Sequence, residues 1–147
     1  MSTCKLHRTV SGIFEGLAAA ILLMTLLFNF TGAPDFRFVF TALGAEPWGR
    51  IATGLLELLA ACLLLRDRQA VFGALLSLGL MSGALCCHFT TLGIVVRDDG
   101  GLLFALAGTV LGASAIILWL RRCELLHLGT RLFSAFRSDR TEAAAKS

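Results

Sequence analysis

Glu57 is the residue of this chain whose position most strongly suggests chemistry. It lies inside Gly49–Leu65, an apolar run without turn signals, and Arg50 precedes it by seven residues. Seven residues at about 100° each bring a helix back to within about 20° of its start, so both side chains share one face. A carboxylate near the middle of a membrane costs at least about 2.5–3.5 kcal/mol, so it usually faces the protein interior and has a partner or a function.

Metal and thiol chemistry have weaker support. Cys86, Cys87 and His88 are consecutive, so on a helix they point about 100° apart and do not converge on one ion. None of the five cysteines forms a C-x-x-C motif, and adjacent cysteines rarely pair. We therefore expect no metal site and no intrinsic redox centre, with Cys86 and Cys87 as small apolar core residues. Whether the chain is an enzyme stays open, and the lack of a catalytic set argues against it.

The composition indicates a membrane protein of one domain, residues 1–122. The chain has 147 residues, of which 56% are hydrophobic and 16% charged, whereas soluble domains are about 25% charged. Its apolar runs predict four helices, at residues 10–30, 49–65, 70–90 and 101–120. Each would span roughly 25–31 Å, close to the hydrocarbon thickness of about 30 Å. The predicted fold is all-α, a polytopic four-helix transmembrane bundle with short interfacial helices.

The basic residues predict how the chain crosses the membrane. The N-terminal segment, the turn at 66–69 and the tail together carry ten Lys and Arg, whereas the other side carries Arg37, Arg50 and Arg97. The positive-inside rule then places both termini of this multi-pass membrane protein in the cytoplasm. The first run exceeds a signal-peptide core and lacks an A-x-A site, so we interpret it as a retained helix. No nucleic-acid-binding motif accompanies the positive charge.

Each predicted helix carries a stripe of small or polar residues that should face the bundle interior, while leucines face lipid. The stripes are Glu15, Ala18, Leu22, Thr25 and Asn29; Arg50, Thr53, Gly54, Glu57 and Ala61; Ser77, Met81, Ala84 and His88; and Ala105, Gly108, Gly112 and Ala115. In this topology four polar residues converge in the outer half of the bundle, namely Asn29, Arg50, Glu57 and His88. Glu15 is expected to lie alone in the inner half.

Three interpretations of Glu57 remain open. It could pair with Arg50 or His88 and only fix the helix register, since a buried polar group can specify packing without a ligand. Alternatively, Asn29, Arg50, Glu57 and His88 could line a small polar pocket that opens outward and binds a quinone head group, a small acid or a proton. Arg50 could also extend to the lipid surface.

Other signals concern packing and the connecting segments. Three helices carry a G-x-x-x-G motif, which predicts close helix packing at Gly12, Gly16, Gly79, Gly83, Gly108 and Gly112.

Pro34–Asp35 and Gly44 bracket either a short interfacial helix or an ordinary loop. Asp99 is a candidate cap for the last helix. Residues 123–137 predict an amphipathic helix on the inner leaflet, followed by a disordered tail at 138–147.

Over residues 8–122 the chain resembles the DoxX family of small bacterial membrane proteins. The resemblance rests on the order of four short helices and on three stretches. These are Trp48-Gly49-Arg50 leading through Gly54 to Glu57, Met81-Ser82-Gly83-Ala84 leading to His88, and Asp98-Asp99-Gly100-Gly101-Leu102-Leu103-Phe104 opening the last helix. The resemblance implies a link to quinone or thiol redox systems, or to assembly of other membrane proteins, and it transfers no catalytic residues.

The sequence therefore supports three functions. The first is an accessory or quinone-binding subunit of a membrane redox system, with Glu57, Arg50, His88 and Asn29 lining the pocket. The second is a structural or assembly protein whose polar cluster only sets packing. The third and weakest is a transporter of small solutes or protons, because four helices leave little room for alternating access. Expected partners are membrane lipids, another membrane or peripheral redox protein, or a second copy of the chain.

Overall fold

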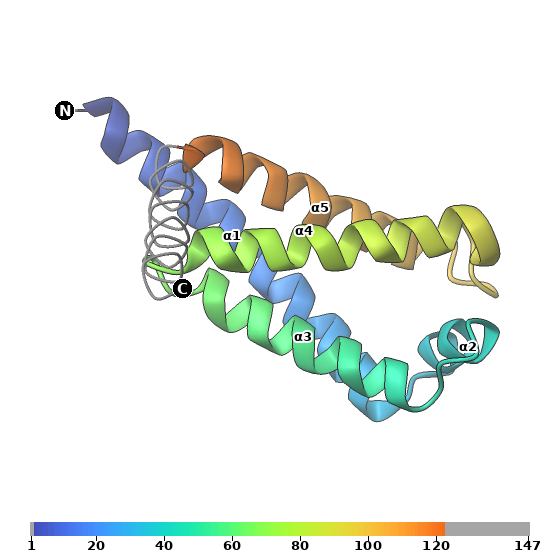
Figure 1. Cartoon of the computed structure of the whole chain (residues 1–147). Helices are drawn as coiled ribbons and strands as arrows, with labels where there is room; N and C mark the ends of the chain where they lie inside the picture. Colours follow the sequence, from blue (N-terminus) through green and yellow to red (C-terminus); the bar gives the residue numbers. More distant parts are fainter. Residues whose placement is uncertain (1, 123–147) are drawn as a thin grey trace, which may run out of the picture.

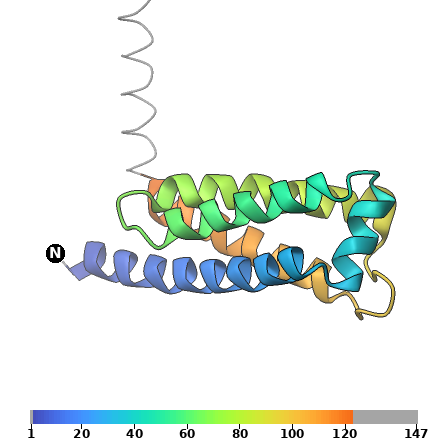
Figure 2. The same ribbon diagram turned by 90° about the horizontal axis from the view of Figure 1, so that it is seen from below.

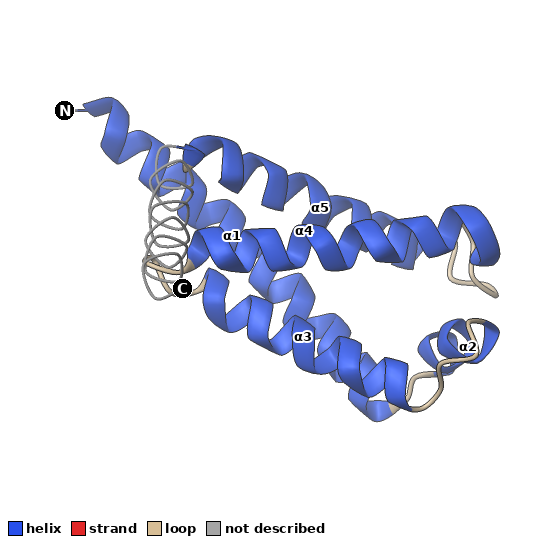
Figure 3. Cartoon of the chain, viewed as in Figure 1, coloured by secondary structure: helices blue, strands red, loops and turns tan. Residues whose placement is uncertain are grey.

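The described part of the chain is entirely helical (Figure 3). A computed structural model describes residues 2–122, with side chains from His7 onward. Its elements are α1 (Ser2–Thr31), α2 (Pro34–Ala42), α3 (Trp48–Leu64), α4 (Ala70–Cys87), a π-helical turn (His88–Leu92) and α5 (Leu102–Leu120). The predicted all-α class is confirmed for this range. The predicted amphipathic helix at 123–137 and the tail at 138–147 lie outside the described residues.

The four longest helices pack side by side around one core. α1 contacts α3 and α5, and α4 contacts the same two helices, so the order around the bundle is α1–α3–α4–α5 (Figure 2). The N-terminus, the α3–α4 turn and the end of α5 lie at one end (Figure 1). We call it the basic end, because it carries Arg8, Arg66, Arg68, Arg121 and Arg122. The opposite end, where α2 lies, is called the α2 end.

Three helical stretches are long and apolar enough to cross a membrane: His7–Thr31, Ala70–Leu92 and Leu102–Leu120. Many large apolar side chains face outward, among them Leu27 and Trp119, each 65% exposed. Such extensive apolar exposure is unusual for a soluble monomer and suits a lipid environment. The predicted membrane class is supported. A span at α3, which has 17 residues, stays a prediction.

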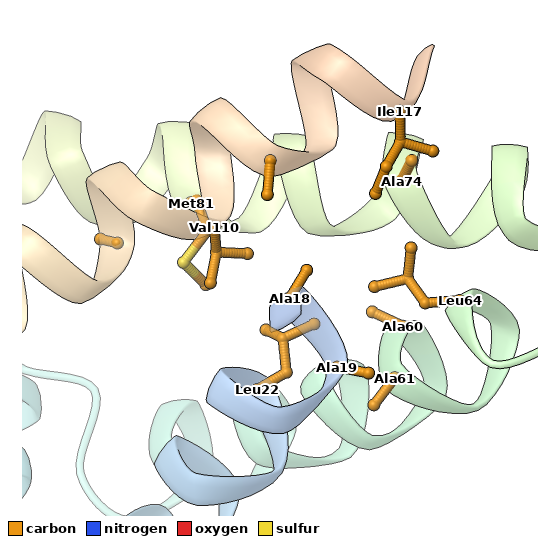
Figure 4. Close-up of a cluster of buried hydrophobic side chains, with 12 residues drawn as sticks. Ala18, Ala19, Leu22, Ala60, Ala61, Leu64, Ala74, Met81, Val110 and Ile117 are labelled. Atoms are coloured by element: carbon orange, nitrogen blue, oxygen red, sulfur yellow. The ribbon is translucent and has the colours of Figure 1, made fainter. Parts of the chain in front are cut away.

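The core uses small side chains to bring the helices close together (Figure 4). Ala18, Ala60 and Ala74 are fully buried where α1, α3 and α4 meet. In lipid, where apolar burial gives little drive for association, such close van der Waals contact stabilises helix packing. The hydroxyls of Ser77 and Ser114, 2.8 Å apart, add a buried hydrogen bond between α4 and α5.

The predicted inward face of the last helix was wrong. Ala105 and Ala115 are exposed, and Gly108 and Gly112 are only half-buried. The buried residues of α5 are Ala107, Val110, Ala113, Ser114 and Ile117. Because α5 is apolar on every side, its sequence holds little periodicity, and small residues alone did not mark the contact face.

The expected core position of the cysteines was also wrong. Cys86 is exposed and Cys87 is half-buried. Both positions suit a helix whose outer surface faces lipid rather than water. Cys62 is exposed as well. A cysteine is apolar enough to lie on such a surface at little cost, so its type did not indicate its side of the helix.

Glycine permits close approach at Gly54 and Gly73. A Cβ on Gly73 would lie 2.6 Å from the Leu64 backbone nitrogen, so glycine is required where α3 turns back into α4. A Cβ on Gly54 would lie 3.1 Å from the Phe30 ring. By contrast, a Cβ would meet nothing within 4 Å in the described chain at Gly12, Gly16, Gly79, Gly83, Gly108 and Gly112. The predicted role of those six glycines in helix packing stays a prediction.

The predicted short helix between the first two long ones is confirmed as α2. Pro34 occupies its first turn, where the absent N–H costs no hydrogen bond, and Gly44 follows with a φ of 66°. The Phe36 ring stacks on Phe28 of α1, with 6.1 Å between the ring centroids. α2 therefore lies at the end of the bundle opposite the N-terminus, where it contacts α1, α3 and the π-helical turn (Figure 2).

Candidate functional site

Glu57 forms a buried pair with Asn29 across α1 and α3. Glu57 is 3% exposed and Asn29 is 2% exposed. Asn29 Nδ2 donates a 2.8 Å hydrogen bond to Glu57 Oε2. At Gly54 the two helices approach closely, and a Cβ there would be in van der Waals contact with the Asn29 Cβ, at 3.5 Å. The carboxylate thus has a neutral amide, rather than a cation, as its partner.

The predicted pairing of Glu57 with Arg50 or His88 was wrong. Arg50 Nε binds Glu46 Oε1 at 2.9 Å, and its Nη1 donates to the backbone oxygen of Asn29. Arg50 and Glu57 share a face of α3, but two helical turns separate them. Glu46 precedes Arg50 by only four residues, so its carboxylate is closer to the guanidinium. Arg50 therefore holds the backbone of Asn29, while the Asn29 side chain binds Glu57.

His88 lies where α4 changes to the π-helical turn. Its Nδ1 lies 2.8 Å from the Gly93 backbone oxygen, and the Gly93 N–H donates to the His88 backbone oxygen. Since a carbonyl only accepts, Nδ1 carries a proton and donates it to this bond. The edge of the ring also packs on Phe104 of α5, with centroids 5.7 Å apart. π-helical turns are frequent at functional sites.

A cavity of about 110 Å³ joins these groups. Asn29, Glu57 and His88 all line it, so three of the four predicted site residues meet there, while Arg50 acts behind Asn29. Most of the remaining lining is apolar, and it comes from all five α-helices (Ile21, Leu22, Thr25, Phe36, Val39, Phe40, Thr53, Leu80, Met81, Ala84, Leu103, Leu106, Ala107 and Val110). The cavity is smaller than the apolar cavity of about 150 Å³ known to bind benzene, so it suits at most one ring.

A larger groove of about 550 Å³ borders the cavity between α2, α3 and α4. The two spaces share Phe40, Thr53, Leu80 and His88 among their lining residues. The groove also includes Leu75, Leu76 and Gly79 of α4 and is almost wholly apolar. The cavity and the groove are therefore neighbours that share part of their walls.

Asn29 Oδ1 is the most informative atom of this site. It is buried and has no hydrogen-bond partner in the described chain. Leaving such an acceptor unsatisfied costs about 1–3 kcal/mol, so buried polar atoms of this kind usually meet a protein group, a water or a ligand. Gln69 Oε1, in the turn before α4, is the other such atom among the described side chains. Asn29 differs from it because it borders a cavity lined by a carboxylate and an imidazole.

The prediction that Glu15 lies alone was wrong. At the basic end, Glu15 Oε1 binds Arg121 Nη2 at 2.8 Å and accepts a 2.6 Å hydrogen bond from Ser11. Arg121 also bonds to the backbone and carboxylate of Asp67, and Asp67 in turn binds Arg8 at 2.7 Å. Arg121 is one of the ten basic residues that the sequence places on the cytoplasmic side. Its position one residue after an apolar helix could have suggested that it turns back onto Glu15.

Two acidic residues outside the membrane-spanning helices have perturbed pKa values. Hydrogen bonds from Arg8 and then Arg121 lower the pKa of Asp67. Burial alone would raise the pKa of Asp99, but three backbone N–H groups, those of Gly101, Leu103 and Val96, outweigh it and lower the pKa. The N-cap position itself is Gly101, but Asp99 does bind the start of α5, as predicted, by accepting the N–H groups of Gly101 and Leu103.

The described residues hold no group of three or more His, Cys, Asp or Glu side chains placed to bind a metal ion. Comparison with family models, curated proteins and solved structures gave no match to this chain. The geometry of the cavity is therefore the main guide to function.

Proposed function

We propose that the chain is a four-span membrane protein that binds a lipid-soluble, quinone-type molecule as an accessory subunit of a membrane redox system. The main observation behind the proposal is that Asn29, Glu57 and His88 line one largely apolar cavity, and that the buried Asn29 Oδ1 has no hydrogen-bond partner in the described chain. Ligand sites typically combine an apolar lining with a few polar groups that orient the ligand. The apolar groove beyond the cavity would accept a hydrocarbon tail.

Several features support a span at α3 and termini in the cytoplasm. α3 packs against both α1 and α4, and at about 1.5 Å per residue its 17 residues reach roughly 26 Å. The N-terminus, the α3–α4 turn and the end of α5 share the basic end, which suits a cytoplasmic face by the positive-inside rule. The cavity would then open on the outer half of a bacterial inner membrane, as the DoxX-like resemblance suggests. Reporter fusions at both termini test this orientation.

The binding proposal is tested with the full chain in lipid nanodiscs. A benzoquinone with a decyl tail, in its oxidised and reduced forms, is titrated by calorimetry. We expect saturable binding of at least one form, at least tenfold weaker in Glu57→Gln. Asp98→Asn is the matched control, since it makes the same carboxylate-to-amide change on an exposed residue at the α2 end. No binding of either form, or equal binding by Glu57→Gln and the parent, would overturn the proposal.

A second candidate function is a structural or assembly factor. One observation favours it: the Asn29–Glu57 hydrogen bond joins α1 to α3, as a register device would. This candidate predicts that Glu57→Gln lowers the melting temperature in detergent, and that pull-downs recover a partner protein. A variant that melts like the parent but loses ligand binding would count against it.

A further inference from the structure

An open pocket at the α2 end gathers positive charge. It has a volume of about 370 Å³ and is lined by residues of α2, of the segment before it and of the loop before α5 (Gly32, Pro34, Arg37, Phe38, Thr41 and Arg97). Arg37 and Arg97 are both exposed. Asp35 and Asp98 are close to these arginines in the sequence, but the lining of the pocket includes no Asp or Glu. Two permanent cations therefore line one space without a carboxylate in its wall.

This pocket lies on the side of α2 that faces away from the cavity of Glu57. At about 100° per residue, Pro34, Phe38 and Thr41 share one side of the helix, and all three line the pocket. Phe36 and Val39 lie on the other side and line the cavity. The pocket is therefore a separate site, and an inference about it goes beyond the proposed function.

The guanidinium groups of the pocket are available to a ligand. Within the described chain, the Arg37 side chain makes no hydrogen bond or ion pair. Arg97 makes one long contact, from Nη1 to the Pro34 backbone oxygen at 3.4 Å. Arg50, the third basic residue at this end, differs from both, because it binds Glu46 and the backbone of Asn29. Most N–H groups of Arg37 and Arg97 are thus left to solvent or to an anion.

The backbone on both sides of the pocket has an uncommon conformation. Arg97 has a φ of 56°, in the left-handed region that residues with a Cβ rarely adopt. Val96 before it is buried, and its N–H donates to Asp99 at 2.9 Å, so the loop is held there. Gly32 has a φ of 68°, and a Cβ on it would lie 3.6 Å from Arg37 Nε. Such backbone outliers cluster at ligand sites.

From these observations we propose that Arg37 and Arg97 together bind a phosphate group at the α2 end. Two guanidinium groups that face one pocket repel each other, and an anion between them removes that cost. Each guanidinium offers parallel N–H donors that match two phosphate oxygens. Phe38, which is 46% exposed, borders the same pocket and suits a phosphate carried by a lipid. A free phosphate needs only the two arginines, and the test separates these sources.

The test uses the full chain, freed of lipid, in an uncharged detergent. Inorganic phosphate and dihexanoyl phosphatidylglycerol are titrated separately by calorimetry. We expect saturable binding of at least one of them, and the probe that binds more tightly identifies the source of the phosphate group. Saturable binding of neither probe would overturn the inference. The quinone-type proposal stands or falls independently, because its probe carries no phosphate and its cavity lies on the other side of α2.

A pair of double variants sharpens the test. Arg37→Gln/Arg97→Asn removes both charges, and Asn tolerates the positive φ at position 97. We expect it to bind the phosphate probe at least about tenfold more weakly than the parent. Arg66→Gln/Arg68→Gln removes two exposed arginines at the basic end and is the matched control. It should bind within about twofold of the parent, because salt screens charges at that distance.

Two results with these variants would overturn the inference. The first is unchanged binding by Arg37→Gln/Arg97→Asn. The second is an equal loss in both double variants, which would show attraction by net charge alone. If the loop before α5 does not tolerate the change at Arg97, Arg37→Gln alone leaves that loop intact and should still weaken binding by about threefold or more. Arg37→Lys keeps the charge but lacks the paired N–H donors, so its affinity should lie between Arg37→Gln and the parent.

Discussion

The two buried carboxylates of this bundle, Glu15 and Glu57, lie toward opposite ends and have different surroundings. Glu15 binds the Arg121 guanidinium and the Ser11 hydroxyl, and the cluster extends to Asp67 and Arg8. Glu57 meets a neutral amide whose own oxygen is unsatisfied beside a cavity. A carboxylate closed off by a cation holds helices together. A carboxylate with a neutral partner and adjoining space is suited to a ligand.

The largest effect is expected from removing the cation at the basic end. Arg121→Met leaves Glu15 buried without its guanidinium partner, so the free energy of unfolding should fall by about 3–5 kcal/mol. Thermal or denaturant unfolding in detergent measures it. The double variant Arg121→Met/Glu15→Met should recover most of the loss, because no uncompensated charge remains. A single-variant loss below about 1 kcal/mol would show that this cluster does not stabilise the bundle.

A smaller effect is expected at the close approach beside the basic end. In Gly73→Ala the added methyl would meet the Leu64 backbone at 2.6 Å, which cannot move without shifting α3. Overpacking of this kind typically costs about 1–3 kcal/mol. Gly79→Ala, on the same helix and with nothing within 4 Å, is the matched control and should melt like the parent. Equal melting of both variants would contradict the packing of α3 on α4.

A substitution at Asp99 tests the stability of the α2 end and leaves Asn29 and Glu57 unchanged. Asp99→Ala removes the acceptor that holds the first turn of α5, so stability should fall by about 0.5–2 kcal/mol. The pKa of Asp99 lies below its ordinary value of 3.8, so its contribution is present above that value and is lost as the pH falls through the lowered pKa. Unfolding at pH 7 and near pH 3 should differ more in the parent than in the variant. An identical pH dependence would contradict the cap.

The smallest effect on stability is expected from replacing the cavity pair as a unit. Asn29→Leu/Glu57→Met removes a buried carboxylate and an unsatisfied acceptor together, and such replacements are often neutral or stabilising. We expect a free energy of unfolding within about 1 kcal/mol of the parent or above it, while binding of the decyl-tailed benzoquinone probe is lost. A large loss of stability would instead show that the Asn29–Glu57 pair stabilises the fold, as the Glu15–Arg121 cluster does.

Much of the site could be predicted from the sequence because helical periodicity is local. The stripes of α1 and α3 already placed Asn29 and Glu57 on inward faces, and both are buried. The convergence of His88 on the same cavity followed from the alternating direction of successive helices. The stripe of α5 was wrong because an all-apolar helix carries no periodicity, and there the neighbouring helices decide which side is buried.

The sequence by itself determined the helical class, the apolar runs, the gathering of basic residues at one end and the cap at Asp99. These depend on composition and on residues within a few turns of one another. Only the tertiary structure decided which partner each buried charge takes. Glu57 takes Asn29 and Glu15 takes Arg121 because contacts between α1 and its neighbours α3 and α5 join residues far apart in the chain. The cavity that Asn29, Glu57 and His88 line exists only once those helices are packed.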